Sequence, residues 1–94
     1  MTKELNERGR QLRAQALFSR GTELLQKQQP EQALGLLQQA HKLEEGDMSI
    51  LQALVILYMQ EGRQDHARTY AEKLLAMDPE NPQLQQWVGG ILGR

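Results

Sequence analysis

Apolar positions recur every three or four residues along nearly the whole chain, which is the spacing of one face of an α-helix. Prolines, glycines and short polar residues interrupt this pattern and separate five segments. We expect helices over about 3–27, 30–46, 47–62, 64–77 and 82–92. No segment alternates between apolar and polar residues as a strand would. Loops of about two to four residues make neighbouring helices antiparallel, so the pattern predicts an all-α fold of helical hairpins.

The residues at the predicted boundaries support these five helices. Asp47 and Asn81 are residue types that cap helix N-termini, and Pro30 and Pro82 suit the first turn of a helix. Gly62 fits the left-handed conformation that closes many helices. We therefore expect the helix ends to be set by local sequence.

The first predicted helix is the longest. Gly9 lies inside it and costs roughly 1 kcal/mol relative to alanine, so we expect a bend or fraying at that point. The side chains expected to face the core from this helix are Leu5, Leu12, Ala16, Leu17, Leu24 and Leu25.

A spacing of 34 residues relates many positions of the chain to one another. It connects Ala33 with Ala67, Leu17 with Leu51, Leu43 with Met77, Leu24 with Tyr58 and Leu92, and Gly21 with Gly89. Self-similarity at this period is typical of stacked helical hairpins, which present extended binding surfaces.

Two units of this spacing resemble a known family. The second unit has large residues in its first helix, a glycine turn, a small contact residue and a closing Met-Asp-Pro, at Leu51, Leu54, Tyr58, Gly62, Ala67 and residues 77–79. The first unit matches it at Leu17, Gly21, Leu24, Ala33, Leu37 and Ala40. Together they resemble the tetratricopeptide repeat family. Glycine and alanine at positions 21, 33 and 67 would let the helix axes approach closely.

The resemblance implies a short right-handed α-solenoid in a single domain over residues 1–94. Repeat one would span residues 14–47 after an N-terminal helix extension, repeat two would span 48–81, and 82–94 would form a capping helix. The family pattern is broken at Arg20, Glu45, Val55, Ala71 and Leu74. The alternative is a helical bundle whose periodicity is accidental.

In this family the first helices of successive repeats line a concave groove that binds an extended or helical peptide. The resemblance places the groove residues on the first and third helices, at Gln15, Phe18, Thr22, Leu25, Gln26, Ser49, Gln52, Ile56, Met59 and Gln60. The lysine, asparagine and arginine set that clamps acidic chain ends in some members is replaced by Phe18, Thr22, Gln52 and Ile56. The resemblance therefore implies no carboxylate clamp.

The middle of this expected groove is apolar, with glutamine at its edges. Such a groove suits the apolar face of an amphipathic segment, and Met59 can adjust to varied partners. We expect a protein-interaction module that acts as an adaptor or chaperone-like escort. Two alternatives remain open: Phe18 and Ile56 could pack into the chain's own core, or the same surface could join copies of the chain as a structural element.

The composition offers little for catalysis. The chain has no cysteine, so disulfides and cysteine-type zinc sites are excluded. His41 and His66 are 25 residues apart on different predicted helices, with no convincing second ligand at a metal-binding interval. No glycine-rich phosphate loop follows a strand. We expect no enzymatic activity, no cofactor and no metal.

The net charge is only −1, but it is unevenly distributed. Residues 1–20 hold five basic and two acidic residues, and residues 21–47 hold two basic and five acidic ones. Arginines without interleaved aromatic residues are weak evidence for nucleic acid, so we expect a solvated basic face and no nucleic-acid partner. The longest apolar stretch, Ala53 to Met59, is far shorter than the roughly 20 residues of a membrane span.

No basic start followed by an apolar run is present at the N-terminus, so we expect no signal peptide. The expected location is cytoplasmic, unless the chain is a domain excised from an exported protein. The expected partner is a protein or peptide, or a second copy of the chain.

Overall fold

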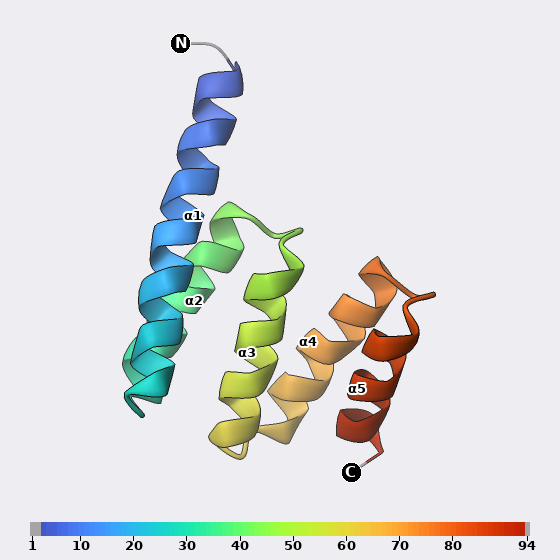
Figure 1. Cartoon of the computed structure of the whole chain (residues 1–94). Helices are drawn as coiled ribbons and strands as arrows, with labels where there is room; N and C mark the ends of the chain where they lie inside the picture. The colour runs from blue at the N-terminus through green and yellow to red at the C-terminus, as the bar shows by residue number, and fades with distance from the viewer. Residues whose placement is uncertain (1–2, 94) are drawn as a thin grey trace.

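The computed structural model describes the backbone of residues 3–93 and the side chains of residues 6–93. Within this range the chain forms five helices and no strand (Figure 1). They are α1 (Lys3–Gln26), α2 (Pro30–Leu43), α3 (Met48–Gln60), α4 (Gln64–Met77) and α5 (Pro82–Leu92). The predicted all-α fold is confirmed. The predicted bounds agree closely, except that α2 ends three residues before the expected Gly46.

Side-chain caps begin α3 and α5 as predicted. One carboxylate oxygen of Asp47 accepts hydrogen bonds from the backbone amides of Ser49 at 2.9 Å and Ile50 at 3.2 Å. The side-chain oxygen of Asn81 accepts from the amide of Leu84 at 3.2 Å. Each cap satisfies amides that have no partner inside their own helix, so these two helices have well-defined starts.

The turns that close α1 and α3 have the same backbone form. Gly62 has a φ of 74°, as expected, and Gln28, which lies 34 residues earlier, has a φ of 60°. The amides of the following residues, Arg63 and Gln29, each donate to a carbonyl five residues back, at 2.8 and 2.9 Å. This is the Schellman closure. The sequence repeat therefore extends to the turns, although the first turn places a residue with a Cβ in the left-handed region.

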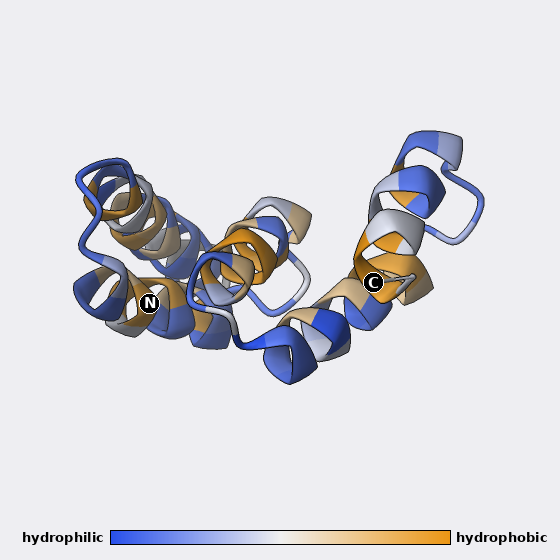
Figure 2. Ribbon diagram, turned by 90° about the horizontal axis from the view of Figure 1, so that it is seen from below, coloured by the Kyte–Doolittle hydropathy of each residue, from blue (hydrophilic) through white to orange (hydrophobic). Residues whose placement is uncertain are grey.

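The helices form two antiparallel hairpins, α1–α2 and α3–α4, followed by α5 (Figure 1). Seen from below, α1, α3 and α5 lie along one side of the molecule and α2 and α4 along the other (Figure 2). The central helix α3 packs on both α2 and α4. It accordingly supplies much of the core, with Ile50, Leu51, Ala53, Leu54, Val55, Leu57 and Tyr58 all buried.

Close packing within the first hairpin depends on Gly21. A Cβ built on Gly21 would lie 2.9 Å from both Cγ and Cδ2 of Leu37, closer than real Cβ contacts. The predicted close approach of α1 and α2 is therefore confirmed. The corresponding positions of the second hairpin hold Val55 and Ala71, both fully buried. The two pairs contain the same number of side-chain carbon atoms, so the larger residue has changed helix while the total volume is retained.

The N-terminal part of α1 differs from expectation. Leu12 is 60% exposed and Ala16 is exposed, so their predicted places in the core are wrong, whereas Ala14 is buried. Ala16 is exposed because it lies on the outward face of α1, with Ser19 and Glu23. Leu12 lies one turn earlier on the same face and also beyond the hairpin, because α1 has 24 residues and α2 only 14 (Figure 1). Residues 6–13, which we call the arm, are all exposed, and the helix continues through Gly9. The side chain of Leu5 lies outside the described residues.

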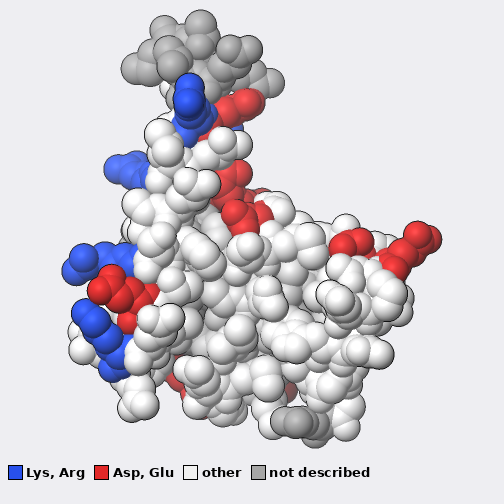
Figure 3. Space-filling view, in the orientation of Figure 1, with Lys and Arg blue, Asp and Glu red and all other residues white. Residues whose placement is uncertain are grey.

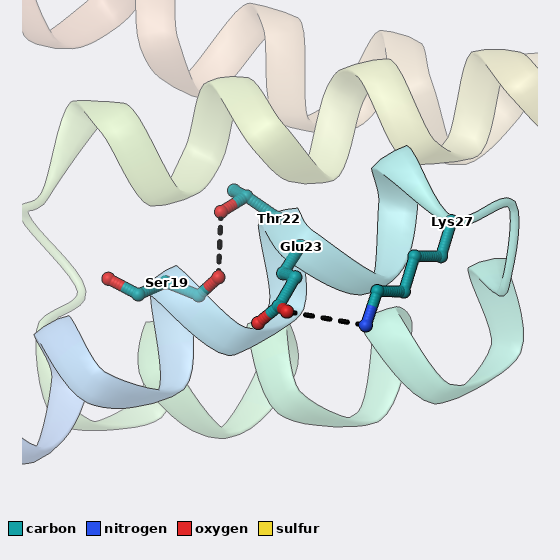
Figure 4. Close-up of polar contacts among 4 residues, drawn as sticks. All are labelled: Ser19, Thr22, Glu23 and Lys27. Carbon is teal, nitrogen blue, oxygen red and sulfur yellow. Dashed lines mark hydrogen bonds and ion pairs between the residues drawn. The ribbon is translucent and has the colours of Figure 1, made fainter.

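The outward face of α1 is polar where the equivalent face of α3 is apolar. Ser19, Arg20 and Glu23 are exposed, and Glu23 pairs with Lys27 at 3.3 Å (Figure 4). The residues 34 positions later, all buried, are Ala53, Leu54 and Leu57. Helix α3 needs apolar residues there because it packs on α2. The departure from the family pattern at Arg20 is thus explained by a face that contacts water.

Candidate protein-binding face

The α1 half of the predicted groove offers little free apolar surface. Phe18 and Leu25 are half-buried and pack against the core. The hydroxyl of Thr22 donates to the backbone oxygen of Ser19 at 3.0 Å (Figure 4). The remaining predicted residues of this helix, Gln15 and Gln26, are exposed.

The α3 half is more open. All five predicted residues are exposed, namely Ser49, Gln52, Ile56, Met59 and Gln60. Ile56 is 39% exposed and Met59 is 38% exposed. Large hydrophobic residues are this exposed at only two other places in the described part of the chain, Leu12 and Met77. Because Gln52, Ile56 and Met59 follow helical spacing, they form one continuous stripe.

A hollow lies between α3 and α5, next to this stripe. Both helices pack on α4, yet among the described residues no Cα of α5 comes within 8 Å of one in α3. A cavity of about 390 Å³ is lined by Met48, Ser49, Gln52, Leu74, Asn81, Gln83, Leu84 and Trp87. A second cavity of about 160 Å³ is lined by Met59, Gln64, Ala67, Arg68 and Ile91. We call this surface, with α4 as its floor, the α3–α5 trough.

The sequence interpretation missed the α5 wall of the trough. The sequence predicts α5 only as a capping helix, whereas Gln83, Leu84 and Trp87 of this helix line the larger cavity. A signal was present, because Gln83 lies 34 residues after the predicted groove residue Ser49. Ile56 lies on α3 between Gln52, which lines the larger cavity, and Met59, which lines the smaller one, although Ile56 itself lines neither.

The helices that form the walls of the trough, α3 and α5, carry no acidic or basic side chain. Neither α3 nor α5 contains an aspartate, glutamate, histidine, lysine or arginine. Figure 3, in the orientation of Figure 1, shows an almost uncharged surface over these two helices. When an apolar group binds to such a surface, few charges on the protein lose their water, so the desolvation cost is small. The trough is therefore suited to uncharged groups.

The two histidines lie together in an aromatic cluster away from the trough linings. His66 stacks on Tyr58 at 4.9 Å between ring centroids, Tyr58 stacks on Tyr70 at 5.6 Å, and His41 meets Tyr70 edge-on at 5.8 Å. Burial and the nearby charge of Lys73 lower the pKa of His41. This cluster joins α2, α3 and α4. Among the described side chains, no three histidine, aspartate or glutamate residues gather as metal ligands.

Comparison with protein families shows which family this chain belongs to. The family model described as Tetratricopeptide repeat matches residues 24–88, more than half of the chain. The chain belongs to the tetratricopeptide repeat family. A search of curated proteins finds no match. Among the described residues, no helix is long and apolar enough to cross a membrane.

The family match excludes the alternative that the 34-residue periodicity is accidental. Tetratricopeptide repeats generally mediate protein–protein interaction, and repeat stacks provide concave surfaces for it. The matched range contains α2, α3 and α4 completely and α5 up to Val88. It therefore includes the lining of the larger cavity, whereas Gln15, Phe18 and Thr22 lie before its first residue.

Proposed function

We propose that this chain is a protein-interaction module that holds an apolar segment of a partner protein in the α3–α5 trough. The observation that carries this proposal is the exposure of Ile56 and Met59 beside a hollow whose walls are uncharged. Exposed apolar groups that gather on one face mark interaction sites more often than single ones do. The trough takes the place of the α1–α3 groove expected from the sequence.

The lining of the trough suggests how a segment is held. Apolar side chains of the segment would contact Ile56, Met59 and Trp87, and the amides of Gln52 and Gln83 would form hydrogen bonds at its polar edge. The unbranched side chain of Met59 adapts to partners of different shape. Such a module would serve as an adaptor, or as an escort that covers an apolar segment of its partner.

Burial of Ile56 and Met59 by a partner would supply part of the binding free energy. Full burial of such side chains contributes roughly 1.5–3 kcal/mol, so covering the exposed part of Ile56 and Met59 contributes about 1 kcal/mol each. An aspartate at either position removes this term and adds the cost of taking a charge out of water. The double variant Ile56→Asp, Met59→Asp should therefore lose at least about a hundredfold in affinity.

The test compares capture of partners by three immobilised proteins: the native chain, the Ile56→Asp, Met59→Asp variant, and a matched control. The control Leu12→Asp, Met77→Asp changes two apolar residues outside the trough that are at least as exposed as Ile56 and Met59. We expect a partner that the native chain and the control bind and the trough variant does not. Circular dichroism should show equal helix content in all three. Equal binding by the trough variant would refute the proposal.

Self-association is a second candidate because Leu12 is 60% exposed on the arm. A helical segment with no tertiary contacts is marginal in water, so two arms could pack together. Sedimentation of the native chain and of Leu12→Asp separates the two functions. A native dimer that Leu12→Asp converts to a monomer would assign the arm to assembly, and a native monomer at high concentration would leave the trough as the interaction site.

A further inference from the structure

Charged residues around the trough are distributed one-sidedly. Residues 43–62 and 74–93, which include α3, α5 and the loops before them, contain no lysine or arginine. The two loops that precede these helices instead hold five acidic residues: Glu44, Glu45, Asp47, Asp78 and Glu80. We call these five residues the acidic rim.

The acidic rim lies at one end of the trough. Because α3 and α5 run in the same direction, the loops before them lie at the same end (Figure 1). Two rim carboxylates each accept a hydrogen bond from a residue that lines the larger cavity. Asp78 accepts a hydrogen bond from the side chain of Asn81 at 3.0 Å, and Asp47 accepts one from the amide of Ser49. Both Asn81 and Ser49 line that cavity.

The opposite end of the trough differs in charge. Arg68 lines the smaller cavity there, and the only acidic residue in the turn between α3 and α4, Glu61, pairs with Arg63 at 3.4 Å. The trough therefore has an uncharged middle, an acidic end without basic residues in its loops, and an end that carries a cation. A segment with basic residues at the acidic end would gain affinity from the rim, and a segment with acidic residues there would be repelled.

One rim residue is best placed to attract a partner. Asp47 caps α3 and Asp78 bonds Asn81, so part of their charge is already used within the chain. Glu80 is exposed, and no ion pair involves it among the described residues, whereas Glu45 lines a separate cavity together with His41 and Lys73. Glu80 is therefore the rim residue from which complementarity can be tested without disturbing a helix start.

We propose that the natural partner segment is an uncharged apolar stretch with lysine or arginine residues at one end, and that these basic residues lie on the acidic rim. This inference rests on the proposed function, because it assigns the chemistry of the segment held in the α3–α5 trough. The basic end fixes the orientation of the segment in the trough. The middle of the segment carries no charge because the walls that it contacts are uncharged.

The test selects binders from a displayed library of random peptides against the native chain. Selected peptides are then titrated against the trough variant Ile56→Asp, Met59→Asp, the rim variant Glu80→Lys, and a control, Glu72→Lys. The control reverses one exposed acidic residue of α4 that lies outside the acidic rim and lines neither trough cavity. Helix content and the unfolding midpoint are measured for every variant.

We expect peptides that need the native trough to carry basic residues at one end of an uncharged run. The rim variant should weaken them about threefold, for one reversed exposed charge, and the control should change their affinity by less than about 1.5-fold. Their affinity should also fall as salt is added.

Each other outcome has a definite meaning. Trough-dependent peptides that lack a basic end, or that bind the rim variant equally well, would overturn this inference and leave the proposed function standing. A selection without any trough-dependent peptide would overturn both. If a peptide of residues 3–17 competes for the trough and the native chain dimerises, the occupant is the basic arm of a second copy, which would overturn a separate partner.

Discussion

The exchange of volume between Gly21 and Leu37 in one hairpin and Val55 and Ala71 in the other can be tested directly. We predict that Gly21→Val and Leu37→Ala each destabilise the chain strongly, and that together they largely compensate. A Cβ on Gly21 would already lie 2.9 Å from two atoms of Leu37, against about 3.5–4.0 Å for good carbon contacts. Overpacking of this kind costs roughly 1–3 kcal/mol.

The second single variant leaves a void. Leu37 is fully buried, and truncating such a leucine to alanine costs about 2–5 kcal/mol. Simple addition gives about 3–8 kcal/mol, which is comparable with the whole stability of about 5–14 kcal/mol expected for a chain of this length. In the double variant the added valine carbons occupy the space that the leucine leaves. We expect a loss of about 1–2 kcal/mol and a coupling energy of about 2 kcal/mol or more.

Urea unfolding followed by circular dichroism gives the four free energies of this cycle. Gly21→Ala, a smaller intrusion, replaces Gly21→Val if the latter does not fold. A matched cycle uses Gly35→Val with Leu37→Ala, because a Cβ on Gly35 meets nothing within 4 Å. That control pair should be additive. If the Gly21 and Leu37 effects also add to within about 0.5 kcal/mol, the compensation argument is refuted.

Three further predictions concern local features. Gln28→Gly should stabilise the chain by about 0.5–1 kcal/mol in thermal or urea unfolding, because it relieves a left-handed φ of 60°, partly offset by the entropy of glycine in the unfolded chain; a loss of stability would contradict this. Asp47→Ala should cost about 1 kcal/mol through loss of the α3 cap, and Asp47→Asn should retain most of it. Since burial and Lys73 lower the pKa of His41 in the folded chain, the unfolded chain binds more protons below about pH 6.5, and stability should fall as the pH decreases through that value. His41→Gln should flatten this slope, and an unchanged slope would show that another group causes it.

Local signals placed the helices well because their causes lie within a few residues of each boundary. Asp47 and Asn81 cap their helices through side chains that reach two or three residues ahead, and Gly62 takes the left-handed conformation that few other residues adopt without strain. The 34-residue offset also makes Gln28 the equivalent of Gly62, and the two residues have the same left-handed conformation in their separate turns.

The same periodicity could not show which apolar residues have a helix opposite them. Leu12 and Leu17 are both expected on the core stripe, yet Leu12 is exposed on the arm and Leu17 packs on the core. Five residues place them about 140° apart on a helix, so Leu17 shares the face of the buried Ala14, whereas Leu12 faces away from it and lies beyond the end of α2. A helical pattern reports which side of a helix is apolar; whether that side is covered depends on a neighbour that the pattern does not contain.

The sequence by itself determined the helices, their side-chain caps, the turn at Gly62 and the repeat. Only the tertiary structure decided where the hollow lies. It opens between α3 and α5 rather than beside α1, because α5 packs on α4 alone while Phe18 and Leu25 settle against the core. Helix identity follows from short-range interactions that repeat along the chain. A trough is the space that several helices leave between them, and its position depends on how far each one leans toward its neighbours.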